Sequence, residues 1–390
     1  MDNSDLEFLK DFFTKCDQIR FQSNSLADLE QKLDGLGYTA EVLAQSIHPP
    51  LSADLHLHSN YSDGQLFPRQ VAWMARLIGL QAAALVDHNS VSGVKEFIAA
   101  GQQIGLEAWG GIELETALPG CEILVYFPET GPFLKFLDSP AADFFHRTLE
   151  RRQETLHSIA IQAMNDLNKL LRQLGKTDFI TEEELAKWYS GVTPYYPGTL
   201  SVLFLERLSA AERERYKVFN PRNVTTKFLT PILQRLKKQT TINKSEETLS
   251  MIKALKHQDF LVLAVLAHPV EMRNNAGMTL AEIKDFSMNL ACDSILDGIE
   301  VRNPRDGETE AKEWLGIWQS IREELLPRGR EFLAFSYSSD FHILTPDENT
   351  GTFTLGYGLL NQTFPNGNLK ELKEWQFFRK MIFKLIHHTL

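Results

Sequence analysis

Residues 52–64, Ser-Ala-Asp-Leu-His-Leu-His-Ser-Asn-Tyr-Ser-Asp-Gly, combine a short apolar strand pattern with two histidines spaced two positions apart. On an extended segment His56 and His58 point to the same side, because side chains alternate with a period of two. Asp63 follows five residues after His58. The stretch therefore predicts a strand, Ser52–His56, that delivers metal-binding side chains at its carboxyl end.

Four further predicted strands end in groups of the same kind. They are Gln81–Val86 before Asp87 and His88, Glu107–Ile112 before Glu113, Phe260–Ala267 before His268, and Phe332–Tyr337 before Asp340 and His342. The carboxyl ends of parallel strands meet on one face of an α/β fold, where active sites form. We therefore expect these five strand ends to converge, although they are far apart in the sequence.

Amphipathic helical patterns separate these strands and predict an α/β fold with a mostly parallel sheet or barrel. Between about 130 and 255 the alternation stops, and helical spacing alone is recognisable. We interpret residues 51–130 and 258–390 as two parts of one barrel, the second closing with a helix at Leu369–Ile386. Residues 131–257 are then an inserted helical cap, and residues 1–50 an N-terminal helical extension.

The composition limits the possible partners. The chain has 390 residues, with 51 acidic and 40 basic side chains and a formal net charge of −11. This charge disfavours long nucleic acid as a partner, but it allows a small phosphorylated substrate held at a local cationic site such as a bound metal. The longest apolar run is too short to cross a bilayer, and the start lacks a signal peptide pattern. We expect a cytoplasmic protein without a membrane partner; its oligomeric state stays open.

The donor types indicate which ions are expected. Imidazole and carboxylate bind Zn²⁺, Mn²⁺ and Fe²⁺, and no cysteine accompanies them as in structural zinc sites. The number of donors exceeds what one ion needs, so two or three divalent ions are predicted. Two ions can polarise a phosphoryl group, generate hydroxide at neutral pH and stabilise the leaving oxygen. Each residue alone has a simpler explanation, since Asp63 could cap the helix near Pro68 and Asp340 could be a turn residue.

The motifs together resemble the polymerase and histidinol phosphatase (PHP) superfamily. The matching segments are Asp54–Gly64, Leu85-Val86-Asp87-His88, Leu266-Ala267-His268-Pro269 and Ser339-Asp340-Phe341-His342. Gly111-Ile112-Glu113 is similar to the strand that carries the family's bridging carboxylate, and Gly298-Ile299-Glu300-Val301 to a segment before the last motif. The resemblance covers about 51–128 and 260–345. It leaves the first 50 residues and the helical insertion without a counterpart.

This resemblance implies a distorted (β/α)₇ barrel with a metal cluster at the carboxyl ends of its strands. It assigns the ligands of three ions: His56, His58, Glu113 and Asp340 to the first, Glu113 and His268 to the second, and Asp63, His88 and His342 to the third. The last three residues are also the expected catalytic residues. Asp63 within Ser-Asp-Gly is similar to the small phosphoesterase branch, which cleaves phosphate esters of nucleotides and related compounds.

The strand after the bridging Glu113 departs from the family pattern. That strand usually supplies another histidine to the second ion, whereas Glu122 occupies the corresponding place here. As a ligand, Glu122 would keep a donor atom and add negative charge, which favours a harder ion such as Mn²⁺. The alternative is a solvent-facing residue at the start of a strand.

Arginine side chains are the candidates for substrate binding, because their planar forks match phosphate oxygens. Arg151 lies at the start of the long inserted helix, and Arg302 follows the predicted strand at Gly298–Val301. Arg147 and Arg151 are one helical turn apart, a spacing that is also typical of a solvated helix face. Arg302 is favoured because it follows directly from a strand end.

These observations predict a metal-dependent phosphoric ester hydrolase acting on a small nucleotide-like, sugar or amino-alcohol phosphate. Two alternatives stay open. One is an amidohydrolase-like reaction on the same metals. The other is a metal-stabilised binding protein that contacts a partner through its insertion and first 50 residues. A nuclease acting on long nucleic acid fits the family but is disfavoured by the net charge.

Overall fold

The computed structural model describes most of the chain between Ala53 and Phe335, with short pieces on either side. The described residues are 15, 19, 26–39, 53–64, 66–77, 80–188, 197–239, 244–301, 306, 308–335, 339–340, 346–347 and 352–353. The helix predicted at Leu369–Ile386 and most of the predicted extension 1–50 lie outside them. Within the extension, helix α2 spans Leu26–Gly35.

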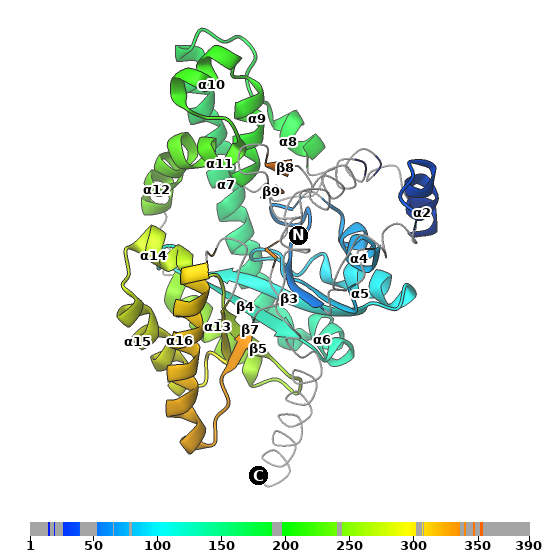
Figure 1. Ribbon diagram of the computed structural model, residues 1–390, viewed down its shortest axis with the longest axis vertical. Helices are drawn as coiled ribbons and strands as arrows, with labels where there is room; N and C mark the ends of the chain where they lie inside the picture. Colours follow the sequence, from blue (N-terminus) through cyan, green and yellow to red (C-terminus); the bar gives the residue numbers. More distant parts are fainter. Residues whose placement is uncertain are drawn as a thin grey trace.

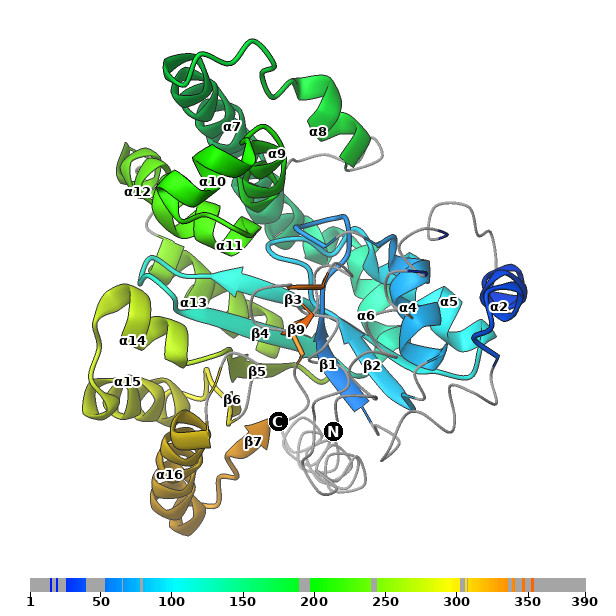
Figure 2. The same ribbon diagram turned by 45° about the horizontal axis from the view of Figure 1, so that its top comes forward.

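A curled seven-stranded sheet forms the centre of the fold (Figure 2). Its strands follow one another in sequence order: β1 (Ala53–Leu57), β2 (Ala82–Leu85), β3 (Glu107–Glu115), β4 (Glu122–Phe127), β5 (Leu263–Leu266), β6 (Gly298–Glu300) and β7 (Leu333–Phe335). Neighbours are parallel except at β4, which is antiparallel to β3 and β5. Each predicted strand is present. Because β4 runs in reverse, its first residue lies at the edge where the parallel strands end.

Helices cover the sheet and bury its outward-facing side chains in the main hydrophobic cluster (Figure 1). They are α4 (Pro68–Leu77), α5 (Val94–Gln103), α6 (Thr130–Leu137), α13 (Lys244–Lys256), α14 (Val270–Ala276), α15 (Leu280–Cys292) and α16 (Glu308–Leu325). Short 3₁₀ turns occupy Pro140–Ala142, Pro197–Thr199 and Leu326–Arg328, and a two-stranded sheet pairs β8 (Pro346–Asp347) with β9 (Thr352–Phe353). No helix in the described ranges is long and apolar enough to cross a membrane.

The other face of the sheet carries a smaller cluster of strand side chains, and the candidate site continues from this face. On β3, Trp109 belongs to the small cluster, while Ile112 and Leu114 belong to the main one. Since side chains alternate along a strand, Glu113 points to the same face as Trp109. Ser339, which follows β7 in the sequence, lies beside β1, where its backbone N–H donates to Asp54 Oδ1 at 3.1 Å.

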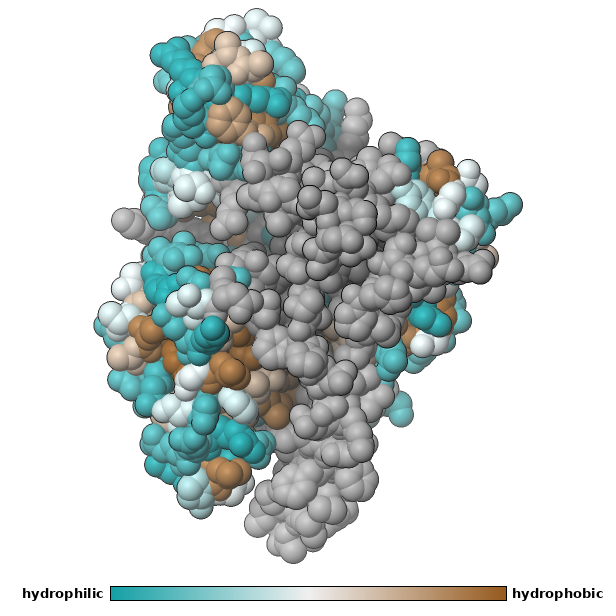
Figure 3. All heavy atoms as spheres, viewed as in Figure 1, coloured by the Kyte–Doolittle hydropathy of each residue, from teal (hydrophilic) through white to brown (hydrophobic). Residues whose placement is uncertain are grey.

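A second hydrophobic cluster organises the helices between β4 and β5. Helix α7 (Asp143–Gln173) places Phe145 and Leu149 in the main cluster, and its later residues, from Ile159 onward, in the second one. The second cluster also includes side chains of α8 (Glu182–Trp188), α9 (Leu200–Glu206), α11 (Pro221–Val224), a π-helical turn (Thr225–Leu229) and α12 (Thr230–Gln239), and α10 (Ala210–Tyr216) lies among these helices. On the face drawn in Figure 3, hydrophilic side chains predominate over these helices. The described part of this segment therefore has a core of its own; the domain boundaries stay a prediction.

Candidate metal centre

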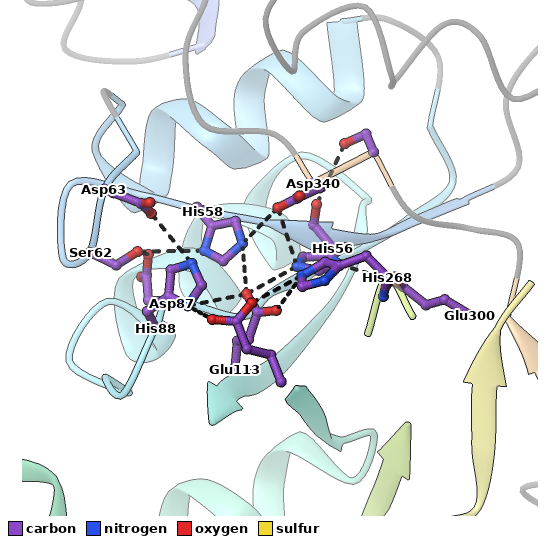
Figure 4. A network of polar contacts seen from close by, with 12 residues as sticks. His56, His58, Ser62, Asp63, Asp87, His88, Glu113, His268, Glu300 and Asp340 are labelled. Atoms are coloured by element: carbon purple, nitrogen blue, oxygen red, sulfur yellow. Dashed lines mark hydrogen bonds and ion pairs between the residues drawn. The ribbon is translucent and has the colours of Figure 1, made fainter. Parts of the chain in front are cut away.

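Eight of the predicted metal-binding side chains meet at one edge of the sheet (Figure 4 labels all of them except Glu122). They are His56, His58, Asp63, His88, Glu113, Glu122, His268 and Asp340. The strand order explains the convergence: six of the seven strands end at this edge, and antiparallel β4 begins there. Of the other predicted site residues, His342 and Arg302 lie outside the described residues, and Arg151 lies on helix α7.

The first group of ligand atoms comes from His56, His58, Glu113 and Asp340, and all lie within 4.8 Å of one another. Glu113 Oε2 is 3.1 Å from His56 Nε2 and 3.2 Å from His58 Nε2. Asp340 Oδ1 is 3.5 Å and 3.4 Å from the same two nitrogens. All four side chains are buried. Two imidazoles and two carboxylates directed at one point form a donor set that fits a single divalent ion.

A second group consists of Glu113, Glu122 and His268. His268 Nε2 is 3.1 Å from Glu113 Oε1 and 3.2 Å from Glu122 Oε2. Glu113 therefore turns Oε2 toward the first group and Oε1 toward the second. This division of its two oxygens is the arrangement required of a carboxylate that bridges two ions.

A third group consists of His58, Asp63 and His88, with His88 Nε2 3.8 Å from Asp63 Oδ1. The family resemblance assigned Asp63, His88 and His342 to one ion and His58 to another. The structure places His58 within reach of both groups. The ligand and catalytic roles of these residues stay a prediction, but their proximity is a property of the fold.

Glu122 faces the cluster, and its position follows from the direction of β4. It is the first residue of β4 and pairs with Glu115 in β3. Its Oε1 is 3.9 Å from His88 Nδ1, in addition to the contact of Oε2 with His268. The carboxylate is thus aimed at the second group rather than outward into solvent.

A register shift in β1 aims the two histidines at the site. Ala53 and Leu55 belong to the inner cluster, but Leu57 belongs to the main cluster on the helix-covered side. The alternation changes at the shift between Asp54 and Leu57, so His56 and His58 turn to the inner face. Irregularities of this kind are common beside active sites because they redirect side chains.

Left-handed backbone conformations occur at three positions in or beside the cluster. Asn89, His268 and Asp340 have φ angles of 50°, 21° and 55°. Residues other than glycine rarely adopt such angles, and strained positions of this type concentrate at functional sites. No feature of the sequence pattern indicated them.

Glu300 is a functional residue to which the sequence analysis assigned no role. Its Oε1 lies 2.9 Å from His56 Nδ1, and its Oε2 accepts the backbone N–H of His268 at 2.6 Å. A carboxylate at Nδ1 holds the proton there, so that Nε2 of His56 can present its lone pair to a metal. Glu300 thereby orients one residue of the first group and one of the second. Its only signal in the sequence was its place at the end of the segment Gly298–Val301.

Two more buried carboxylates hold the loops around the cluster. Asp87 accepts hydrogen bonds from Ser59 N, Ser59 Oγ and Ser62 Oγ at 2.7, 2.6 and 2.7 Å, which fixes the loop that carries Asp63. Asp54 accepts the backbone N–H groups of His56 and Ser339, and burial raises the pKa of its carboxyl to about 7. Both acids therefore hold the backbone and the loop that carry predicted metal-binding residues.

The charges of the cluster favour a cation at its centre. Burial raises the pKa of Glu113, but the neighbouring His88, His56 and His268 lower it more, so it ends well below its usual value. Burial lowers the pKa of His58, yet hydrogen bonds to Asp340 and Glu113 outweigh this and raise it to about 10. In the metal-free chain, protons on His56 and His58, whose pKa values are raised, therefore supply positive charge that divalent ions would otherwise provide.

Metal binding is expected to release protons and to weaken as the pH falls. His58, with a pKa of about 10, carries a proton throughout the neutral range, and an ion must displace it. For each proton that the ion displaces, the apparent affinity for the metal should rise about tenfold for every unit by which the pH increases, as long as the pH stays below that pKa. Zn²⁺ titrations of the metal-free chain at pH 6, 7 and 8, with an indicator dye reporting released protons, measure this directly. An affinity that does not change with pH would contradict a protonated His58 in the metal-free chain.

The two arginines at the start of α7 have different surroundings. Arg151 is exposed and forms an ion pair with Glu247. Arg152 is buried and also binds Glu247, with Nε 2.9 Å from Oε2. A substrate-binding role for Arg151 or Arg302 stays a prediction.

The curled α/β sheet brings buried imidazoles and carboxylates together at its strand ends, a donor set that could hold metal ions. Residues 54–206 match the model of the PHP domain family. The resemblance to the PHP superfamily is therefore confirmed. The matched range includes six of the eight clustered side chains, Glu122 among them, together with the first part of the helical segment.

The chain is also similar to individual proteins. A 5′-3′ exoribonuclease of Haemophilus influenzae is 37% identical over 67 residues, which span 17% of this chain and 24% of that protein. A protein of Bifidobacterium adolescentis named as a metal-dependent phosphoesterase has 18% identity, covering 76% of this chain and 90% of its own with a TM-score of 0.51. An amidohydrolase of Chromobacterium violaceum has 20% identity, coverages of 75% and 87%, and a TM-score of 0.49. The predicted α/β fold is confirmed as a curled seven-stranded sheet covered by helices.

Proposed function

We propose that this protein is a metal-dependent phosphoesterase that hydrolyses a small phosphate ester at a cluster of two or three divalent ions. The observation that carries the proposal is the division of the Glu113 carboxylate between two groups of ligand atoms. A carboxylate in this position can hold two ions side by side. When bound, such ions polarise the phosphoryl group, supply a nucleophilic hydroxide at neutral pH and stabilise the leaving oxygen.

The surplus of acidic groups supports more than one ion. Within the described part of the chain, seven carboxylates lie in or beside the cluster: Asp54, Asp63, Asp87, Glu113, Glu122, Glu300 and Asp340. Four histidines accompany them: His56, His58, His88 and His268. Buried carboxylates need compensating positive charge, and an anionic phosphate brought to the site would need still more. Two or three Mn²⁺, Zn²⁺ or Fe²⁺ ions would supply it.

The residues of the chain would hold the metal ions and orient the side chains that bind them. The first and second groups would hold the ions that Glu113 joins, and Glu300 keeps His56 and the backbone of His268 in place. Asp63 and His88 lie where, with the predicted ligand His342, they would hold a third ion against the phosphate. Imidazole and carboxylate in this third group can also exchange protons with substrate oxygens.

A nuclease acting on RNA ends is the second candidate. The match to a protein named as a 5′-3′ exoribonuclease favours it, although the matched segment spans about a quarter of that relative. The same metal site would serve both reactions, because both cleave a phosphoester bond. The net charge of −11 favours the small substrate.

The test has two stages. Elemental mass spectrometry of protein purified without chelators should find two or three equivalents of Mn, Fe or Zn per chain. Nucleoside monophosphates, sugar phosphates, 5′-phosphorylated RNA oligonucleotides, amides and lactones are then compared as substrates. Cleavage of mononucleotides or sugar phosphates supports the proposal, and cleavage of RNA alone supports the nuclease. Turnover of amides or lactones without phosphate esters would overturn both in favour of an amidohydrolase.

Replacing Glu122 by His is expected to change the metal preference of the second group. The substitution keeps a donor atom opposite His268 but removes a negative charge, and imidazole favours Zn²⁺ over Mn²⁺ more than carboxylate does. Competition between Zn²⁺ and Mn²⁺ for the metal-free chain should shift toward Zn²⁺ by about tenfold. Glu107→His, at the opposite end of β3, is the control. An unchanged preference would mean that Glu122 is not a ligand.

A further inference from the structure

Helix α7 leads from the sheet into the helical segment, and two of its side chains form hydrogen bonds with the turn that follows His88. Arg152 Nη1 donates to Asn89 Oδ1 at 3.1 Å, and Gln153 Nε2 donates to the Asn89 carbonyl oxygen at 2.9 Å. From the other side, Asn89 N donates to the carbonyl oxygen of Glu113 at 2.8 Å. Asn89 is therefore held between α7 and β3 by its side chain, its carbonyl and its amide.

This turn determines where the His88 imidazole lies. Asn89 is in the left-handed region with φ of 50°, and His88 pairs with Glu113 in an isolated bridge between their backbones. The imidazole lies between Asp63 and Glu113, with Nδ1 3.3 Å from Glu113 Oε2. Because a metal ligand must be placed to within a fraction of an ångström, a change in the backbone of Asn89 would misplace His88.

All three nitrogens of the buried Arg152 guanidinium donate hydrogen bonds to neighbouring residues. It is 2% exposed, and Nε donates to Glu247 Oε2 at 2.9 Å. Nη2 donates to Thr248 Oγ1 at 2.8 Å, and Nη1 also reaches the carbonyl oxygen of Glu115 at 3.3 Å. Glu247 and Thr248 lie on α13, the helix that returns from the helical segment. One guanidinium thus joins both helices to β3 and to the turn at Asn89.

We propose that Arg152 and Gln153 are positioning residues that set the His58–Asp63–His88 group by clamping Asn89. The inference rests on the proposed metal-dependent function and adds a role for the helical segment. The affinity for the ion of this group depends on how α7 is seated against the sheet. The other two groups use residues of β1, β3, β4 and the segments after β5 and β7. They meet the clamp through His58 and Glu113, and we expect them to depend on it less.

The experiment measures the affinity of each ion in the full-length chain. Metal-free protein is titrated with Zn²⁺ against a competing chelator, so that the successive dissociation constants are resolved. Asn89→Gly keeps the left-handed backbone and removes the acceptor, and Gln153→Ala removes the second bond. Each is expected to weaken the binding of one ion by about tenfold, and Arg152→Met by about 10- to 100-fold, with smaller changes in the remaining dissociation constants. Arg152→Met combined with Asn89→Gly should lose no more than Arg152→Met alone, because both act on one contact.

Two controls separate positioning from general loosening. Arg207→Met removes another buried arginine, one that binds Glu184 and the Leu203 carbonyl within the helical segment. Gln162→Ala removes an exposed amide further along α7. Both should leave every dissociation constant unchanged. Wild-type dissociation constants in Asn89→Gly and Gln153→Ala would overturn the clamp. These two variants stay informative if Arg152→Met does not fold. An equal loss of metal affinity in Arg207→Met would also overturn it. A wild-type chain that binds no Zn²⁺ would instead overturn the proposed function, and the clamp with it.

Discussion

Glu113→Gln is expected to lower kcat/KM for the phosphate ester by about 10³-fold or more, which is about 4 kcal/mol of transition-state stabilisation. Glu113 is fully buried, and its two oxygens contact His56, His58 and His268 at 3.1–3.2 Å. Glutamine has the same shape but offers one neutral oxygen in place of two charged ones. Two ions should therefore be lost or weakened together, which elemental analysis of the purified variant would show.

The control for this variant is Glu107→Gln at the opposite end of the same strand. Glu107 accepts a hydrogen bond from Trp109 Nε1 at 3.2 Å and lies away from the cluster. Its variant should keep the metal content and activity of the unmodified chain. Circular dichroism of both variants checks that the sheet is intact. A Glu113→Gln protein with full activity and metal content would exclude Glu113 as the bridging ligand.

Asp340→Asn is expected to reduce turnover by about 10²- to 10³-fold through loss of the first ion. Asp340 Oδ1 lies within 3.5 Å of the Nε2 atoms of His56 and His58, and the side chain is 1% exposed. Asparagine is preferred to alanine here because Asp340 has φ of 55°, a conformation that asparagine tolerates and alanine does not. The variant thus removes the charge without forcing the backbone to change.

The measurement combines steady-state kinetics with metal content, and Asp285→Asn on the exposed face of α15 is the control. If the ion is lost, excess Mn²⁺ or Zn²⁺ should restore part of the activity. Full activity of Asp340→Asn without added metal would remove Asp340 from the ligand set. Equal losses in Asp285→Asn would show that the effect comes from the fold rather than from the site.

The convergence of the site could be predicted because it depends on strand direction and on side-chain type. His56, Glu113 and His268 each lie at or beside the end of a strand that parallel pairing brings to the same edge. Apolar strand patterns separated by helical patterns are enough to predict that arrangement. The position of Glu122 was open in the sequence, because the direction of β4 depends on its pairing with β3 and β5 and not on its own residues.

Contacts over long sequence separations could not be predicted. Glu300 is 244 positions from His56, and Arg152 is 63 positions from Asn89, so no local spacing relates them. The register shift in β1 and the positive φ angles of His268 and Asp340 are also set by neighbours that the pattern does not name. Each of these features changes the position of a side chain by a small distance, and metal binding is sensitive to changes of that size.

The α/β class, the strands and the metal-binding residue types at their ends can be read from the amino-acid sequence, because they follow from side-chain alternation and from the chemistry of imidazole and carboxylate. The tertiary structure decided which oxygen of Glu113 faces which histidine, that Glu122 points inward, and that α7 grips the turn after His88. These contacts depend on the tertiary structure because a strand pattern specifies only which way a side chain points relative to its own backbone. Its distance from a residue on another strand is set only when the whole sheet and its covering helices pack.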